Sequence, residues 1–205
     1  VNLFVMWILI CYNKVMKRTK IITISGESGS GKSTFSKFLA EKTGAKVVSV
    51  DEIISKLYEN DVFCKKLVSA FGNQICENGK VLKQNVGNLV FEDKQKQDML
   101  TKISTPFIEK EIKNQMKGQG ISIIDYKFAP MLSFFKNADM NILLIANDDG
   151  KRLKLLLKRD NLPKEYLLAR DKNRVDYALY HFDFKIFHDY ENLEGKAEEI
   201  ACKLK

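Results

Sequence analysis

The 205-residue chain has few of the residues that build metal or redox centres. It contains two histidines and four cysteines, and the cysteines show neither a CxxC pair nor the spacing of metal ligands. Cysteines in this pattern are typical of reduced thiols in a cytosolic protein. We expect His181 and His188 to be ordinary polar residues near the last strand, because two isolated histidines do not make a metal site. The sequence thus gives no sign of a disulfide framework or a His/Cys metal centre.

A membrane-spanning run is missing as well. The apolar stretch at residues 3–11 is far shorter than the roughly 20 residues that cross a bilayer. It also precedes a basic cluster, whereas a signal peptide carries its charges first. Two interpretations remain: an extra N-terminal strand or interfacial anchor, or an upstream extension of the gene model with Met16 as the natural start. We favour the second, and expect residues 1–15 to be a non-native or disordered extension.

The chain also lacks a concentrated charge of one sign. Its net charge is +8, from 34 basic and 26 acidic residues. Four of the basic residues lie within the first twenty, which hold no acid, so the rest of the chain carries only +4. No Lys/Arg stripe interleaved with aromatics is present. This balance suits anionic small substrates and argues against a nucleic-acid partner.

What the sequence does have is GESGSGKST at residues 26–34. This segment follows a short apolar run and precedes a helical pattern, which is the strand–loop–helix setting that G-x-x-x-x-G-K-[ST] requires. Its glycines let backbone N–H groups form a nest for phosphate oxygens, next to the positive end of a helix. We expect Lys32 to reach the outer phosphates and the Ser33 hydroxyl to bind Mg²⁺. The nucleotide-binding residues predicted in this way are Gly26, Ser28, Gly29, Ser30, Gly31, Lys32, Ser33 and Thr34.

Two acidic residues follow predicted strands. Asp51 comes after residues 46–50, and Asp125 ends the strand at residues 121–125. Asp51 has two interpretations: the N-cap of the next helix, or a catalytic carboxylate, since parallel sheets place their chemistry at the carboxyl ends of strands. Asp125 occupies the place where a second carboxylate supports Mg²⁺ or its waters in phosphate-loop enzymes.

The middle of the chain, residues 60–117, is helical and far longer than a crossover connection needs. We predict helices at 62–71, 83–91 and 93–116, with Gly72 ending the first and Asn78-Gly79 forming a turn. Pro106 is expected to kink or divide the last helix. We interpret this region as a helical substrate-binding insertion.

After a strand at 141–146, residues 151–163 carry five cations in their first nine positions, followed by Arg170 and Arg174 on one helical face. This segment is either a solvated basic helix or a lid that brings cations to a migrating phosphoryl group. A short strand at 182–187 and a helix at 193–204 complete the pattern. The region after the fourth strand lacks an N-K-x-D guanine motif, so a small kinase fits best.

From about Ile21 to Leu193 the sequence resembles the dephospho-coenzyme A kinase family. The resemblance is carried by the phosphate loop, VDEII at 50–54, FGNQI at 71–75, NG at 78–79 with VF at 90–91, TPFI at 105–108, and KRD at 158–160. It implies a parallel core of five strands, a helical domain for the CoA moiety and a lid over ATP. It also implies phosphorylation of the ribose 3′-hydroxyl of dephospho-CoA, the last step of CoA synthesis.

Residue by residue, the resemblance makes Asp51 the general base, Lys32 and the loop amides the phosphate ligands, Ser33 and Asp125 the Mg²⁺ residues, and Arg159 the lid cation. The chain departs from the family pattern mainly on the acceptor side and in the lid. On the acceptor side, residues 126–130 stand where the family has Pro-Leu-Leu and an acid, Thr105 stands where it has His, and Glu109 where it has Arg. Elsewhere, Leu155 replaces an Arg of the lid, His188 replaces an Asn, and Glu27-Ser28 replaces Gly-Ile in the phosphate loop. Lys127, Lys83 or Arg174 could supply the missing cations. A different nucleotide or nucleoside acceptor, or a non-catalytic homologue, remains an alternative.

Together these features predict an α/β phosphate-loop fold with a five-stranded parallel sheet flanked by helices. We expect one domain at 16–205, with a core at 20–51, 119–148 and 180–205, a helical insertion at 52–118 and a basic lid at 150–175. The expected ligands are ATP, Mg²⁺ and dephospho-CoA. We expect a cytoplasmic monomer with no nucleic-acid partner and no stable membrane association.

Overall fold

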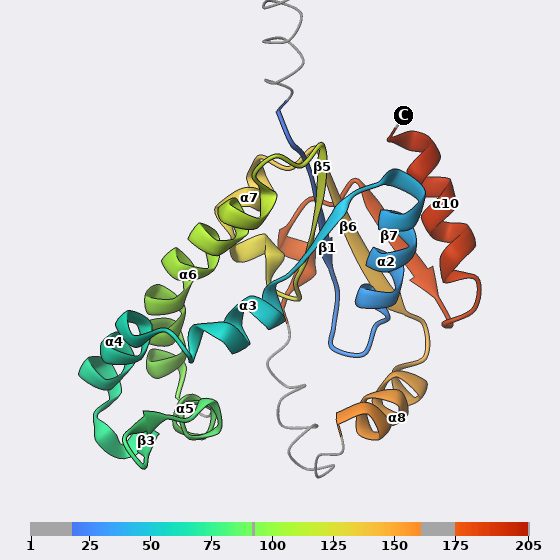
Figure 1. Ribbon diagram of the computed structural model, residues 1–205. Coiled ribbons are helices and arrows are strands. Elements are labelled where there is room, and N and C mark those ends of the chain that lie inside the picture. Colours follow the sequence, from blue (N-terminus) through green and yellow to red (C-terminus); the bar gives the residue numbers. More distant parts are fainter. Residues whose placement is uncertain (1–17, 92, 161–174, 205) are drawn as a thin grey trace, which may run out of the picture.

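The computed structural model describes residues 18–91, 93–160 and 175–204. Its centre is a five-stranded sheet in the order β2-β5-β1-β6-β7 (Figure 1). The strands are Lys46–Ser49, Ile121–Asp125, Lys20–Ser25, Met140–Ala146 and Phe184–His188. All four neighbouring pairs are parallel. The predicted fold class is confirmed, with the last strand starting two residues later than expected.

Helices cover both faces of the sheet, which explains why its central strands β5, β1 and β6 are largely buried and apolar. On one face α2 (Lys32–Thr43) and α10 (Leu193–Lys203) pack together over the sheet, with Phe35 and Leu39 in the core (Figure 1). The other face carries α6 (Lys94–Met116), the 3₁₀ turn η2 (Ala129–Met131) and α7 (Ser133–Lys136). The turn and α7 were not predicted from the sequence.

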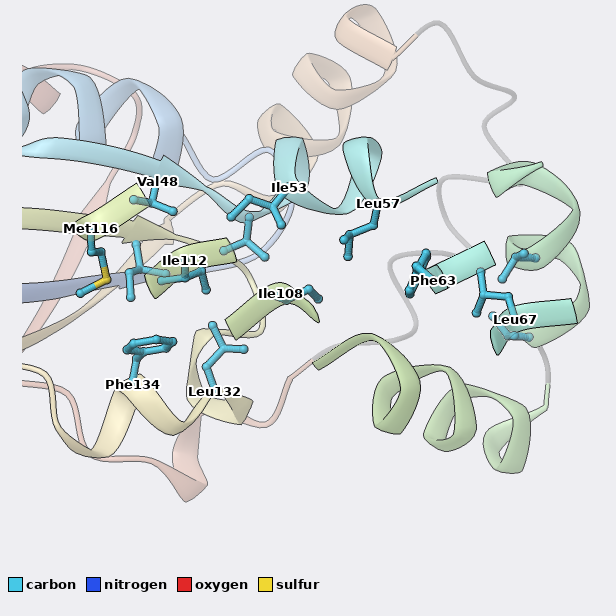
Figure 2. Packing of buried hydrophobic residues seen from close by; sticks show 14 of the residues in the cluster. Val48, Ile53, Leu57, Phe63, Leu67, Ile108, Ile112, Met116, Leu132 and Phe134 are labelled. Carbon is cyan, nitrogen blue, oxygen red and sulfur yellow. The ribbon is translucent and has the colours of Figure 1, made fainter. Parts of the chain in front are cut away.

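The helices between β2 and β5 extend away from the sheet (Figure 1). They are α3 (Val50–Leu57), α4 (Asp61–Phe71), α5 (Lys83–Val90) and α6, with a hairpin of β3 (Cys76–Glu77) and β4 (Lys80–Val81). Figure 2 shows one apolar cluster running from Val48 at the sheet to Leu67 in α4. This extension therefore shares a core with the sheet.

Local signals set the ends of these helices. Asn60 caps α4 by accepting a hydrogen bond from the Phe63 N–H at 3.0 Å, and Gly72 ends it at φ 78°. In the hairpin, Asn78 and Gly79 both have positive φ, as a two-residue type I′ turn requires. The predicted boundaries at Gly72 and Asn78-Gly79 are confirmed.

Pro106 does not divide α6, so that part of the prediction is wrong. The helix is continuous from Lys94 to Met116, although a proline there cannot donate a backbone hydrogen bond. Apolar residues on both sides of Pro106 pack into the same cluster, including Ile103 before it and Ile108 after it. This packing offsets the missing hydrogen bond. No helix in the described ranges is long and apolar enough to span a membrane.

Candidate active site

The phosphate loop connects β1 to α2 and takes a backbone shape that needs glycine. Gly29 and Gly31 have φ values of 77° and 79°. At Gly26 a Cβ atom would collide with the backbone carbonyl of Leu144 in β6. The motif glycines are thus required by backbone conformation and by the neighbouring strand.

Four consecutive carbonyls of the loop accept hydrogen bonds from side chains. Lys32 Nζ donates to the Glu27 carbonyl at 3.0 Å. The carbonyls of residues 28, 29 and 30 accept from Arg152 Nη1 at 2.8 Å, the Tyr190 hydroxyl at 2.8 Å and His188 Nε2 at 2.9 Å. The Ser30 N–H also donates to the Glu27 carbonyl at 3.1 Å, within the loop itself. These contacts hold the loop backbone in a fixed shape before any ligand binds.

His188 is buried and supports this loop, so the expectation of an ordinary polar residue is wrong for it. Its Nδ1 accepts the Tyr190 N–H at 3.0 Å, which leaves Nε2 as the protonated nitrogen that donates to Ser30. Burial lowers the pKa of His188; Lys196 lowers it further, while the Ser30 hydrogen bond and Asp189 oppose the shift. His181, by contrast, is 88% exposed. The family pattern has an Asn at this position, and the resemblance gave no indication that His188 contacts the Ser30 carbonyl.

We expect His188→Asn to reduce the pH dependence of stability. The pKa of His188 is lowered in the folded protein relative to about 6.5 when unfolded. The unfolded chain therefore binds more protons just below that pH, and the free energy of unfolding falls as pH drops. Asparagine can still donate to Ser30 but does not titrate. Urea unfolding between about pH 8 and 5 should show a smaller decline in the variant. His181→Asn is the control, and an equal decline in all three proteins would contradict the prediction.

Lys32 and the two strand-end carboxylates are brought together next to the loop. Burial lowers the pKa of Lys32, and Asp125, Asp51 and Glu27 partly oppose this by attraction. Burial raises the pKa of Asp125, while Lys32 and the adjacent Ser33 hydroxyl lower it. Lys32, Ser33, Asp51 and Asp125 therefore lie close together beside the loop, near enough to influence one another's charge.

Asp51 is not a helix cap. Ser49 is the N-cap of α3, and its hydroxyl accepts the Glu52 N–H at 3.4 Å. Asp51 lies within the first helical turn, at the carboxyl end of β2, with an exposed side chain. The capping interpretation is thus wrong, and the Asp51 carboxylate lies close enough to Lys32 to raise the pKa of that lysine.

Several departures from the family pattern have structural partners. The Glu109 carboxylate accepts the Ser133 N–H at 2.7 Å, at the start of α7. Lys83 donates to the Ser55 hydroxyl at 3.2 Å, between α5 and α3. Lys127 pairs with the Glu27 carboxylate in the phosphate loop. Of the three proposed replacement cations, Lys127 contacts the phosphate loop, and Arg174 lies outside the described residues.

The basic segment begins with α8 (Asp149–Asp160), which is not simply a solvated helix. Arg152 is 2% exposed, and its Nε donates to Asp149 at 2.7 Å while Nη1 reaches Ser28. Sequence reasoning missed this role, although the buried Leu156 one turn later marks the same helix face as internal. Arg159 is exposed in the last turn of α8, and the rest of the predicted lid, including Arg170, lies outside the described residues.

With this geometry in place, comparison with known proteins decides the family. The sequence profile of dephospho-CoA kinase matches residues 20–178. The chain belongs to the dephospho-CoA kinase family. A dephospho-CoA kinase from Fusobacterium nucleatum is 34% identical over 149 residues, which is 71% of this chain and 76% of that protein. One from Listeria innocua is 28% identical over 192 residues, covering 88% and 94% of the two chains.

Solved structures support the fold of this family member. A Thermus thermophilus protein superposes with a TM-score of 0.76 at 19% identity, covering 92% of this chain and all of that one. A shikimate kinase from Acinetobacter baumannii in complex with shikimate gives 0.51 at 16% identity, with 93% and 96% covered. At these identities the likeness shows the fold alone. The predicted family and phosphate-loop kinase fold are both confirmed.

Proposed function

We propose that this protein transfers the γ-phosphoryl group of ATP to the ribose 3′-hydroxyl of dephospho-CoA. The observation that carries the proposal is the cluster of Lys32, Asp51 and Asp125 around a pre-shaped phosphate loop, in a chain of the dephospho-CoA kinase family. Lys32 and the loop N–H groups bind the phosphates. The exposed Asp51 carboxylate is free of helix capping and suited to receive a hydroxyl proton.

In the reaction, Asp51 orients the 3′-hydroxyl and accepts its proton as the oxygen attacks the γ-phosphorus. The new P–O bond forms as the bond to the β-phosphate oxygen breaks, and ADP leaves. Lys32 stays with the phosphates and neutralises charge that develops on the transferred group. Arg159, at the end of α8, is the lid cation that closes over this group.

A magnesium ion fits the oxygen atoms beside Lys32. The Ser33 hydroxyl lies next to the Asp125 carboxylate, and Mg²⁺ is commonly held by one or two protein oxygens together with substrate phosphates. In the part of the chain that the structure describes, no group of three or more His, Cys, Asp or Glu gathers into a metal cage. The ion would therefore arrive with the nucleotide, held by Ser33 and Asp125, and would neutralise phosphate charge.

We further propose a domain arrangement, a cellular location and an oligomeric state for this kinase. Residues 52–118 form the CoA-binding insertion, and residues 150–175 form the lid of a single kinase domain at 16–205. The enzyme works as a cytoplasmic monomer without a nucleic-acid partner or stable membrane association. The shared apolar cluster between the insertion and the sheet supports the single-domain arrangement.

A second acceptor is favoured by one observation. Glu109 stands where the family usually has Arg, and its carboxylate is used at the start of α7. An acceptor other than dephospho-CoA, such as another nucleotide or a nucleoside, would be less dependent on that missing cation.

The test is a coupled ADP-release assay with ATP, Mg²⁺ and either dephospho-CoA or a panel of nucleosides and nucleotides. We expect turnover with dephospho-CoA, and mass spectrometry should show one added phosphate on the product. Turnover only with another acceptor would establish the second function. ATP binding without any turnover would show a non-catalytic homologue.

A further inference from the structure

Lys127 and Glu27 form an ion pair in which both side chains are largely shielded from solvent. Their charged atoms lie 2.6 Å apart, and the side chains are only 11% and 16% exposed. The Lys127 ammonium also lies 5.4 Å from the centre of the Phe128 ring. Both charged residues occupy positions where the family pattern has uncharged ones, in two segments a hundred residues apart in the sequence. The structure therefore joins two separate departures from the pattern into one contact.

The pair lies near the phosphate-binding Lys32. Glu27 belongs to the phosphate loop, and its carbonyl accepts from Lys32. Lys127 is close enough to lower the pKa of Lys32 by repulsion. The preceding residue, Tyr126, is close enough to Asp51 for that carboxylate to help raise the pKa of its hydroxyl. The Lys127 ammonium is thus near the phosphate-binding lysine, and Lys127 follows a residue that lies near the proposed base.

The charged groups around Lys32 include more carboxylates than ammonium groups. Glu27, Asp51 and Asp125 all act on Lys32, so three carboxylates surround two ammonium groups. A bound triphosphate adds further negative charge, and charges interact more strongly in an enclosed site than in water. If Lys127 only neutralised Glu27, Lys32 would be the one ammonium group of this cluster left for the phosphates, besides the proposed Mg²⁺ and the lid cation Arg159.

We propose that Lys127 is a second phosphate-binding cation, held by Glu27 beside the loop, that contacts the γ-phosphate of the bound nucleotide. The Lys127 main chain is fixed independently, because its carbonyl accepts the Tyr177 hydroxyl at 3.0 Å. The ammonium can therefore turn from the Glu27 carboxylate to a phosphate without moving the backbone. This inference rests on the proposed kinase function for its role in turnover, but its binding part requires only ATP.

The competing explanation is a structural brace that simply ties the loop after β5 to the phosphate loop. A buried ion pair is weak evidence for stability, since desolvation of both charges offsets their attraction. A brace and a phosphate ligand predict different results for the two partners. Loss of either residue breaks a brace equally, whereas only loss of Lys127 removes a phosphate ligand.

The first experiment measures the dissociation constants of ATP and ADP, each with Mg²⁺, by calorimetry. We expect Lys127→Met to weaken ATP about 10- to 100-fold, the range for one hydrogen bond to a charged group, and to weaken ADP less than about three-fold. Lys127→Arg should retain most of the ATP affinity. Lys113→Met is the matched control, because Lys113 also lies over a ring, that of Phe134, and belongs to α6. Equal weakening of ATP and ADP by Lys127→Met would overturn the γ-phosphate contact.

The second experiment compares Lys127→Met with Glu27→Gln and with the double variant. We expect Glu27→Gln to weaken ATP clearly less than Lys127→Met does, because it removes a competing carboxylate and leaves the ammonium available. Equal losses in both single variants, with no further loss in the double variant, would identify a brace and overturn the proposal. Thermal unfolding of each variant confirms that the compared proteins are folded.

Failure of this inference and failure of the proposed function give different results. If the wild-type protein binds ATP but does not phosphorylate dephospho-CoA, the function is wrong, while the ATP-against-ADP comparison still tests Lys127. If Lys127→Met raises only the KM of the acceptor and leaves the ATP dissociation constant unchanged, Lys127 contacts acceptor phosphate instead, and the γ-phosphate assignment is wrong.

Discussion

Replacing Asp51 with asparagine is expected to lower kcat about 10²- to 10⁴-fold, the range for loss of a general base, with little change in ATP affinity. Asparagine keeps the size of the side chain but cannot accept the 3′-hydroxyl proton. The structure removes the competing explanation of a helix cap, because Ser49 caps α3. Steady-state kinetics with dephospho-CoA, together with ATP binding by calorimetry, measure the two effects separately.

The matched control for this variant is Glu52→Gln. Glu52 is the next residue of α3, is also exposed, and carries the same charge. It should change kcat less than about two-fold, in line with an exposed residue outside the cluster. If Asp51→Asn retains kcat within a few-fold of wild type, Asp51 is not the base, and the proton must go to solvent or another group.

Replacing Lys32 with alanine is expected to weaken ATP binding and to lower kcat as well, so that kcat/KM for ATP falls by at least about 10²- to 10³-fold. Lys32 binds phosphate in the ground state and also neutralises charge in the transition state. Its removal takes away the cation that lowers the pKa of the buried Asp125, so this carboxyl should become harder to ionise. Nucleotide binding and initial rates across a range of ATP concentrations measure both effects.

Lys37→Ala is the control for Lys32. It lies on the same helix, α2, and is exposed to solvent. Lys32→Met should be measured alongside, because methionine retains most of the packing of the half-buried lysine stem. A variant that loses ATP affinity but keeps kcat at saturating ATP would contradict a transition-state role for Lys32.

Much of the fold follows from local sequence pattern. The short apolar runs ending at Ser25, Ser49, Asp125 and Ala146 all form strands of the sheet. The three central runs are mostly buried, so their apolar character is nearly continuous, whereas in the edge strand β2 only Val48 is buried. Turn and cap signals are equally local, as Gly72 shows. The exception is Pro106, where packing against residues distant in sequence outweighs the local cost of proline.

The loop, Asp51 and Asp125 were identified from the sequence because their chemistry follows from position at the end of a strand. The side chains that hold the loop in shape were not. Arg152, Tyr190 and His188 lie 124, 161 and 158 residues from the loop carbonyls that they contact. Apart from the apolar Leu156 one turn later, no local pattern distinguishes the loop-binding Arg152 from the other cations of this basic helix.

The sequence by itself determined that this chain has a phosphate loop, a parallel sheet and acids at two strand ends, because each depends on neighbouring residues and on the rule that parallel strands share a carboxyl edge. Only the tertiary structure decided that the Glu109 carboxylate accepts the Ser133 N–H at the start of α7, that Arg152 binds the phosphate loop, and that Lys127 pairs with Glu27. These outcomes depend on which side chains from distant segments come within hydrogen-bonding distance after the sheet has formed. That proximity is set by packing of the whole chain.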